Sequence, residues 1–373
     1  MALRSTPPFR GDHVGSLLRP PELLEARRRH AAGEIDDAAL REAEDAAIRD
    51  VVAMQREVGL QTVTDGEFRR TSWHMDFIYR LGGISSTDDR LTVSFKNREG
   101  GLSFEARGLA VTDRISLPEP IFADDFAFVQ SVAGEVQTPK LTIPSPSMVH
   151  YRGGPASIDP EVYPDVEDYW TDLADAYAAQ IRALGEQGCT YLQMDDTSLA
   201  YLNDPAQRQM VRDRGDDPDE LLERYIDTMN RAIAAKPDGM AITTHMCRGN
   251  FQSSWAAEGG YDQVAEALLT TLDVDGFFME FDDERSGTFA PLRHLPEGKV
   301  VVLGLMTTKT GELEDPEVLK ARIDQATEHV PLDQLCLSPQ CGFSSTVEGN
   351  KLTAEQQAAK LRLIVDLAEQ VWG

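Results

Sequence analysis

Short apolar segments alternate with amphipathic stretches along most of the chain, and this alternation limits the possible fold more than any other feature. The segments are rich in Val, Ile, Thr, Phe or Tyr, as is typical of strands buried on both faces of a parallel sheet. The eight segments are residues 12–16, 61–67, 140–146, 191–196, 240–247, 276–281, 299–306 and 334–341. We therefore expect an α/β fold.

Helical patterns lie between these segments. In residues 36–58, Ile48, Val51 and Val52 recur among charged residues, after Asp36 or Asp37 as a helix cap. Similar patterns cover residues 166–186, 218–235, 261–271, 315–328 and 353–371. Eight strands alternating with helices predict a (β/α)8 TIM barrel, and an open doubly wound sheet is the alternative.

Residues 80–139 interrupt the alternation. Their central part, RLTVSFKNREGGLSFEARGLAVTDRIS, is typical of β-hairpins that turn at a Gly-Gly pair. With 41% hydrophobic residues, the chain can bury a large core. We expect one (β/α)8 barrel domain over residues 1–373, with a β-hairpin-containing insertion after the second strand at about 80–139.

The charge balance and the cysteines limit the class of partner. The 63 acidic and 36 basic side chains give a net charge of -27, which disfavours nucleic acids and anionic membranes. We find neither an apolar signal-peptide core nor an uninterrupted apolar stretch long enough to span a membrane. The four cysteines do not form a disulfide framework, so we expect a cytoplasmic protein with reduced thiols.

Polar residues stand where the predicted strands end. In a barrel, the carboxyl ends of the strands converge on one face, and active sites are built there. The residues at these positions are Ser16, Glu67, Asp195, His245, Cys247, Glu280 and Cys341.

A zinc site is expected within this group. His245 and Cys247 are two residues apart, so on a strand they point the same way, while Glu280 ends the next strand. With Cys341 they make a tetrahedral set of one imidazole, two thiolates and one carboxylate, which suits Zn²⁺. Cys189 and Cys336 fit small core residues instead.

These stretches resemble the cobalamin-independent methionine synthase family, in its catalytic C-terminal barrel. The similarity covers nearly the whole chain and rests on HVGS, EVGLQTVTDGEF, YLQMDD, THMC, FFMEF and SPQCGF, in this order. It implies a barrel fold, a zinc held by the residues named above, and a thiol acceptor bound as a zinc thiolate. It also implies that Ser16, Glu67 and Asp195 contact the amino acid part of homocysteine.

Three departures from the long enzymes of this family concern the methyl donor more than the metal. The chain lacks their additional N-terminal barrel and resembles a short, stand-alone type. A histidine thought to assist proton transfer in their loop after the seventh strand is missing from GLMTTKTGELE. The motif after the fourth strand is QMDDTS, where the long enzymes have Asp-Glu-Pro.

Side-chain chemistry suggests further roles. Glu67 and Asp195 suit an ammonium group, although Glu67 could instead pair with Arg69 or Arg70, and Asp195 could cap a helix. Trp73 could stack on a flat donor such as a pterin. His74 and Lys309 are candidate proton donors.

The expected activity is zinc-dependent methyl transfer to a small-molecule thiol, with homocysteine giving methionine. One alternative is alkyl transfer resembling that of epoxyalkane:coenzyme M transferase, whose acceptor carries a sulfonate and no amine. A second alternative is a non-catalytic barrel stabilised by zinc, whose saturated metal would ignore added thiols.

Overall fold

The computed structural model describes residues 4–97 and 100–373. Its strands are β1 (Thr62–Val63), β2 (Gly82–Asn97), β3 (Gly100–Ser116), β4 (Thr138–Pro139), β5 (Leu141–Pro144), β6 (Tyr191–Asp196), β7 (Ala241–Met246), β8 (Gly276–Glu280), β9 (Val300–Met306) and β10 (Leu335–Pro339). Its α-helices are α1 (Pro21–Ala31), α2 (Asp37–Glu57), α3 (Met75–Ile78), α4 (Ala123–Val132), α5 (Ser147–Gly153), α6 (Val166–Glu186), α7 (Ser198–Tyr201), α8 (Pro205–Asp213), α9 (Pro218–Ile233), α10 (Ala265–Thr271), α11 (Pro316–Thr327) and α12 (Ala354–Trp372).

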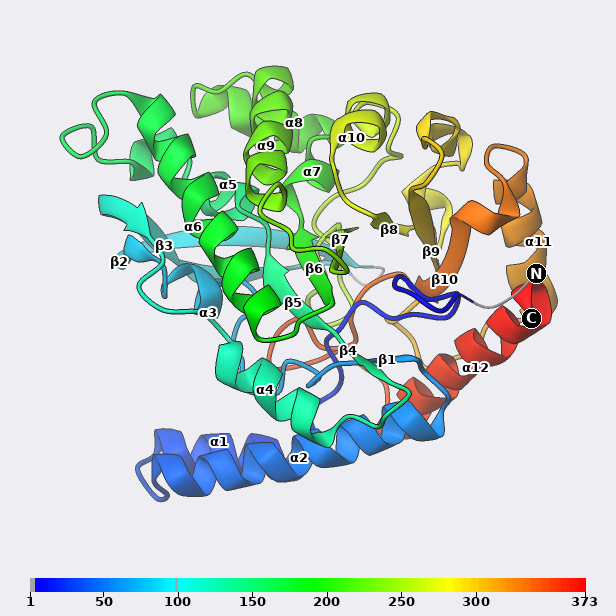
Figure 1. The fold of residues 1–373 in the computed structure, drawn as a ribbon. Helices are drawn as coiled ribbons and strands as arrows, with labels where there is room; N and C mark the ends of the chain where they lie inside the picture. Colours follow the sequence, from blue (N-terminus) through cyan, green and yellow to red (C-terminus); the bar gives the residue numbers. More distant parts are fainter. Residues whose placement is uncertain (1–3, 98–99) are drawn as a thin grey trace.

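The centre of the molecule is a parallel sheet in which β5 to β10 lie in sequence order (Figure 1). Parallel neighbours need a crossover connection between them, and the predicted helices α6, α9, α10 and α11 supply most of these crossovers. The register places Asp195 of β6 opposite His245 of β7. The α/β fold with a parallel sheet is therefore confirmed.

The two ends of this sheet are joined by short, irregular pieces. β4 precedes β5 and pairs in parallel with β1. The Asp12 amide donates to the Leu337 carbonyl at 3.0 Å, and the Leu17 amide donates to the Gly66 carbonyl at 3.1 Å. The segment before α1 thus links β10 to the residues after β1, as in a barrel and unlike an open sheet.

Residues 12–16 form no regular strand, so that detail of the sequence prediction is wrong. Only an isolated bridge from Gly11 to Leu337 is formed. Gly15 adopts a φ of 144°, and a Cβ atom there would lie 2.6 Å from Cγ2 of Thr142. Close packing against β5 requires a glycine at this point and bends the segment out of strand geometry.

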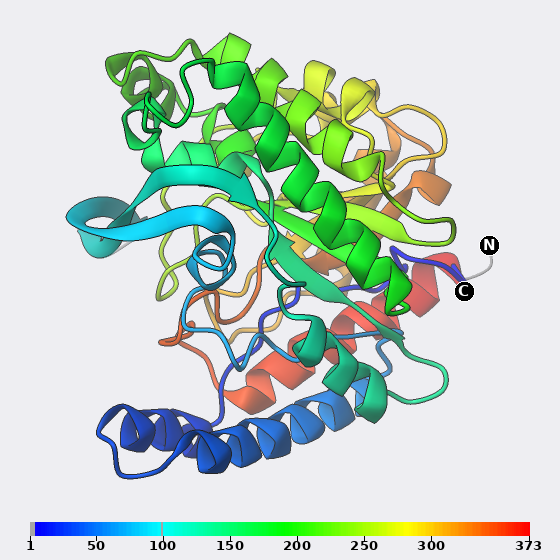
Figure 2. The same cartoon turned by 60° about the vertical axis from the view of Figure 1, so that its left-hand side comes forward.

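The region 80–139 contains one long antiparallel hairpin, β2–β3, followed by the helix α4 (Figure 2). Residues 98–99 lie outside the described part of the chain. The expected turn at Gly100 and Gly101 is wrong, because these glycines pair with Asn97 and Lys96 as the first residues of β3. The Lys96 amide donates to the Trp255 carbonyl at 2.6 Å, and the Trp255 amide donates to the Lys96 carbonyl at 2.9 Å. The hairpin is thereby fastened to the loop that follows β7.

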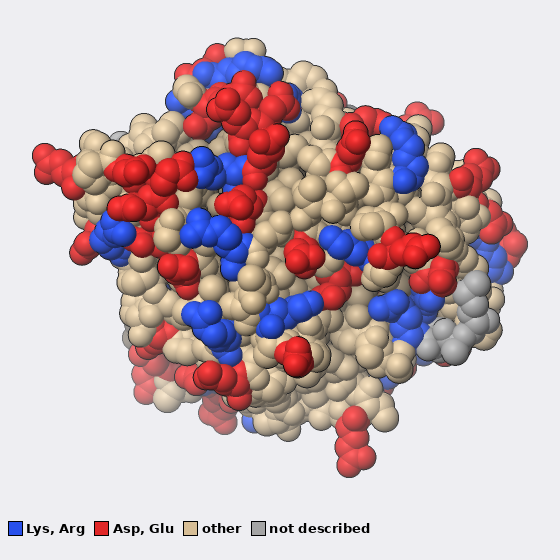
Figure 3. Space-filling view, turned by 45° about the horizontal axis from the view of Figure 1, so that its top comes forward, with Lys and Arg blue, Asp and Glu red and all other residues tan. Residues whose placement is uncertain are grey.

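Apolar side chains fill the space between the sheet and its helices, while the sheet's interior also holds a buried ion pair. Lys140 Nζ lies 3.5 Å from Asp12 Oδ1, donates to the His13 carbonyl at 2.6 Å, and sits over the rings of Tyr191 and Phe278. Among the described residues, no helix combines the length and apolar character needed to cross a bilayer. Figure 3 shows one face, on which acidic and basic side chains are interspersed.

We predict that Asp12→Ala strongly destabilises the fold, because it leaves the buried Lys140 ammonium without its counter-charge. The expected loss in unfolding free energy is about 3–5 kcal/mol, measured by urea denaturation. The matched control is Glu317→Ala, which breaks an exposed pair with Lys320 at 2.8 Å and should change stability little. Equal effects of the two substitutions would contradict the prediction.

Candidate metal centre and substrate cavity

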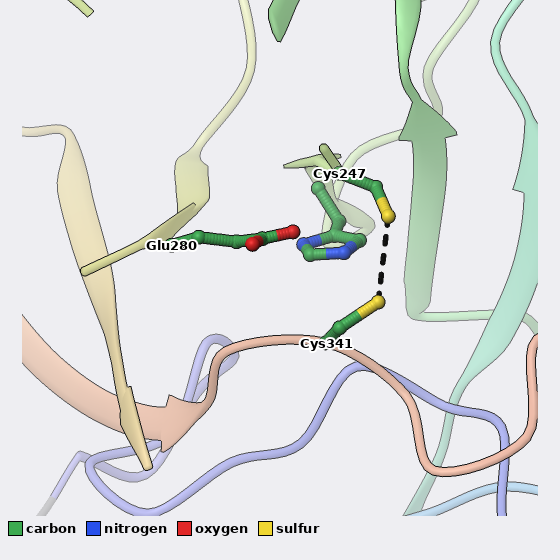
Figure 4. Close-up of side chains that lie close together, drawn as sticks. Cys247, Glu280 and Cys341 are labelled. Carbon is green, nitrogen blue, oxygen red and sulfur yellow. Dashed lines mark hydrogen bonds between the residues drawn. The ribbon is translucent and has the colours of Figure 1, made fainter. Parts of the chain in front are cut away.

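Four ligand-type side chains meet at the carboxyl end of the parallel sheet (Figure 4). His245 lies near the end of β7, Cys247 follows that strand, Glu280 ends β8, and Cys341 follows β10. All four are buried, and their ligand atoms lie within 4.8 Å of one another. The two sulfur atoms are 3.4 Å apart. The strand ends thus bring together every residue of the predicted metal site.

The chemistry of this group fits a metal ion. Both ring nitrogens of His245 and Oε2 of Glu280 are buried without a hydrogen-bond partner among the described residues. Such atoms are costly to bury, and a cation would satisfy the two residues together. One imidazole, two thiols and one carboxylate form a donor set typical of tetrahedral zinc sites.

Neighbouring groups orient the four side chains. The Arg248 amide donates to Glu280 Oε1 at 2.9 Å, and the Glu280 amide donates to the Tyr261 hydroxyl at 2.9 Å. A hydrogen bond from Cys247 holds the pKa of the Cys341 thiol well below its usual value. The thiolate is the form that binds a metal, so this environment favours a ligand state of Cys341.

A cavity of about 180 Å³ borders this group and is lined in part by His245, Cys247 and Cys341. Five other residues predicted from the sequence also line it: Ser16, Glu67, Trp73, His74 and Asp195. The carboxylates and the ligand set therefore share one space, as expected for side chains at the carboxyl ends of barrel strands.

Glu67 is held rigidly at the cavity wall. Its Oε1 accepts a hydrogen bond from Thr142 Oγ1 at 2.9 Å and lies 3.8 Å from a guanidinium nitrogen of Arg70. Its backbone has a φ of 62°, which is strained for a residue with a side chain and is common at functional sites. Glu67 thus has a cationic neighbour of its own while it faces the cavity.

Asp195 has no such neighbour close to it. Its Oδ1 accepts a hydrogen bond from the side-chain amide of Gln193 (Nε2) at 2.6 Å. Burial, together with the nearby charge of Glu67, raises the pKa of Asp195 to about 7, although the charges of His245 and Lys140 oppose this shift. Asp196 differs, because Ser145, Ser147, Ser198 and the Leu199 amide donate to its carboxylate. Asp196 therefore orders the loop before α7.

Ser16 is buried against the segment that carries Cys341. The Ser344 amide donates to Ser16 Oγ at 3.4 Å. A Cβ atom at Gly342 would lie 1.9 Å from the same oxygen, so the residue after Cys341 has to be glycine for Ser16 to reach this place. The close approach ties the Ser16 hydroxyl to the metal-ligand loop.

Trp73 and His74 form one wall of the cavity, with their rings 4.4 Å apart. Burial holds the pKa of His74 well below its usual value, and His74 Nδ1 lies 3.1 Å from Ser72 Oγ. Lys309 lines a separate hollow instead, where its Nζ lies 3.6 Å from Asp282 Oδ2. The structure therefore brings His74, but not Lys309, to the cavity.

Comparison with known proteins agrees with this geometry. Residues 10–370 match the model of a family described as cobalamin-independent synthase, catalytic domain. The chain belongs to the cobalamin-independent synthase family. This confirms the resemblance inferred from the sequence motifs.

Several members of the synthase family are similar over their whole length. The uncharacterized protein YxjH of Bacillus subtilis is 48% identical, over 98% of this chain and 95% of its own. A crystal structure of a candidate vitamin-B12-independent methionine synthase from Listeria monocytogenes has 38% identity and a TM-score of 0.78, with 99% of both chains covered. The methionine synthase of Sulfurisphaera tokodaii is 23% identical, with 92% of each chain covered.

Longer family members are matched only in part. A 5-methyltetrahydropteroyltriglutamate--homocysteine methyltransferase from Bacillus velezensis is 23% identical over 96% of this chain, which covers 42% of that protein.

Three further residues line the cavity and were not predicted from the sequence: Tyr201, Asn250 and Arg152. Asn250 lies just after Cys247 in the sequence, so the motif around Cys247 could have indicated it. Arg152 lies on α5 and not at the end of a strand, so the position of strand ends could not have indicated it.

We predict that Cys247→Ser and Cys341→Ser each lower the bound metal from near one equivalent per chain to a small fraction. Each change removes one of two thiolates from a four-ligand set. The controls are Cys189→Ser and Cys336→Ser, because burial raises the pKa of both of those thiols to about 12 and keeps them protonated. Elemental analysis by mass spectrometry measures the content. Metal loss in the controls, with retention in the first pair, would contradict the assignment.

Proposed function

We propose that this protein transfers a methyl group to the sulfur of a thiol, with homocysteine as the acceptor and methionine as the product. The observation that carries the proposal is the shared cavity, in which the ligand set faces two buried carboxylates. Similarity to methionine synthases, including that of Sulfurisphaera tokodaii, supports it. We also propose that residues 1–373 act as one (β/α)8 barrel domain with the β2–β3 hairpin as its insertion.

We assign zinc to His245, Cys247, Glu280 and Cys341. When bound, zinc supplies a positive charge that lowers the pKa of an acceptor thiol. The reaction forms a bond between sulfur and the methyl carbon and breaks the bond from that carbon to the donor. The donor keeps the bonding electron pair, and the thiol proton is released.

The carboxylates give the acceptor its specificity in this proposal. Every thiol offers the same sulfur, so selection depends on the other end of the molecule. Glu67 is partly neutralised by Arg70, whereas the nearest hydrogen-bond donor to Asp195 is the neutral amide of Gln193. An ammonium group beside Asp195 would supply the missing charge, and Ser16 would add a hydroxyl contact.

Other residues retain the roles proposed from the sequence. Trp73 stacks on a flat part of the methyl donor. His74 and Lys309 remain the candidate proton donors, and His74 is the one that lines the cavity. Its lowered pKa keeps the ring neutral near pH 7, so any proton it donates comes from a neutral imidazole.

We predict that Asp195→Asn weakens homocysteine binding by roughly tenfold or more, because a charge-assisted hydrogen bond to the ammonium is lost. Binding of coenzyme M, which has no amine, should change far less. Calorimetry on the zinc-loaded proteins measures both. The control Asp324→Asn removes an exposed carboxylate on α11 and should change neither affinity.

Two results would overturn the proposed acceptor. Tighter binding of coenzyme M than of homocysteine to the wild-type protein would favour the epoxide-opening type of reaction. Failure of any thiol to alter the X-ray absorption edge of bound zinc would favour a structural metal.

A further inference from the structure

Arg152 is a cation without a partner in the cavity. It lies in the last turn of α5 and lines the same space as the carboxylates. Its Nε is buried without a hydrogen-bond partner, and no ion pair or hydrogen bond joins its guanidinium to any described residue. A guanidinium has five donors, and leaving them unpaired in a partly buried place is unfavourable.

Arg152 forms no ion pair among the described residues, although the chain has 63 acidic and 36 basic residues. Other arginines close to the cavity have partners. Arg70 lies 3.8 Å from Glu67 and donates to Thr142, and Arg19 donates to the Glu67 carbonyl at 2.7 Å. Arg152 is therefore the cavity cation that remains available to a ligand.

The surroundings of Arg152 are aromatic. Its charge acts on His74 and Tyr201, which line the cavity with it. Trp73 stacks beside His74 at 4.4 Å, and the rings of Phe95 and Phe251 lie 5.3 Å apart in the same lining. A flat, apolar body with one anionic group would match this part of the cavity.

The two carboxylates, Glu67 and Asp195, line the same space. The charges that act most on Asp195 are His245 and Glu67, and those that act most on Glu67 are Arg70 and Asp65. Arg152 is not among the leading charges at either carboxylate. Among the residues that line the cavity, the charge of Arg152 thus acts on the aromatic side chains His74 and Tyr201 more than on the two carboxylates.

We propose that Arg152 anchors an anionic group, a carboxylate or a phosphate, of the methyl donor. This inference rests on the proposed function, which assigns the two carboxylates to the acceptor. In homocysteine the ammonium and carboxylate are attached to one carbon atom. Arg152 is not among the charges that act most on Glu67 or Asp195, but it acts on His74, whose ring stacks on Trp73, the side chain assigned to the donor. The second substrate is therefore the one that reaches Arg152.

The test uses benzoate as the probe, since it has a flat body and one carboxylate, and benzamide as its neutral counterpart. Binding to the zinc-loaded protein is measured by saturation-transfer NMR or calorimetry, with and without saturating homocysteine. A fragment of this size should bind with a Kd on the order of 1 mM. We expect wild-type protein to bind benzoate more tightly than benzamide, and homocysteine not to compete.

Arg152→Gln should weaken benzoate binding roughly tenfold or more while leaving homocysteine binding and zinc content unchanged. Arg152→Lys keeps the positive charge but not the bidentate geometry of a guanidinium. Its affinity for benzoate should lie between those of wild type and Arg152→Gln. Arg231→Gln, an exposed substitution on α9, is the matched control and should behave as wild type.

Three outcomes would overturn the proposal. One is unchanged benzoate binding in Arg152→Gln. Another is a wild-type protein that does not distinguish benzoate from benzamide. The third is competition between homocysteine and benzoate together with weakened homocysteine binding in Arg152→Gln, which would assign Arg152 to the acceptor. Failure of homocysteine to bind wild-type protein would instead count against the proposed function, whatever benzoate does.

Discussion

The structure depends on the convergence of four buried ligand groups at one end of a parallel sheet. Two thiols, an imidazole and a carboxylate are buried within 4.8 Å of one another. Both ring nitrogens of His245 and one carboxylate oxygen of Glu280 have no hydrogen-bond partner among the described residues. Such a group is unfavourable in itself and becomes favourable when a cation binds. The glycine at 342 lets Ser16 approach the loop that carries Cys341, and hydrogen bonds from Arg248 and to Tyr261 hold Glu280.

The same convergence organises the cavity beside it. Parallel strands end on one side, so Asp195 and His245 are neighbours across β6 and β7, and Glu67 approaches from the residues after β1. The hairpin β2–β3 and the loop after β7 then cover this space from outside the sheet. The cavity therefore has both acidic and cationic side chains in its lining, which suits two substrates of different charge.

Much of the fold could be predicted from the periodicity of apolar residues in the sequence. The helices α6, α9, α10, α11 and α12 and the strands β6 to β10 follow patterns that buried strands and half-buried helices must show. The regular strand expected at 12–16 is wrong, because Gly15 adopts a φ of 144°, outside strand geometry, where it packs against Thr142. The helix α4 was missed within 80–139, since short apolar and acidic runs do not separate a ten-residue helix from a loop.

The sequence by itself determined the kinds of ligand and their position at strand ends, because the spacing of two residues in a strand and the carboxyl ends of parallel strands are local rules. Tertiary structure alone decided which charges are compensated. Glu67 is paired with Arg70, whereas Asp195 forms no ion pair among the described residues. Lys309 pairs with Asp282 in a separate hollow, and Arg152 lines the cavity without an ion pair to any described residue. Ion pairing depends on distances between side chains far apart in the chain, and no local pattern encodes those distances.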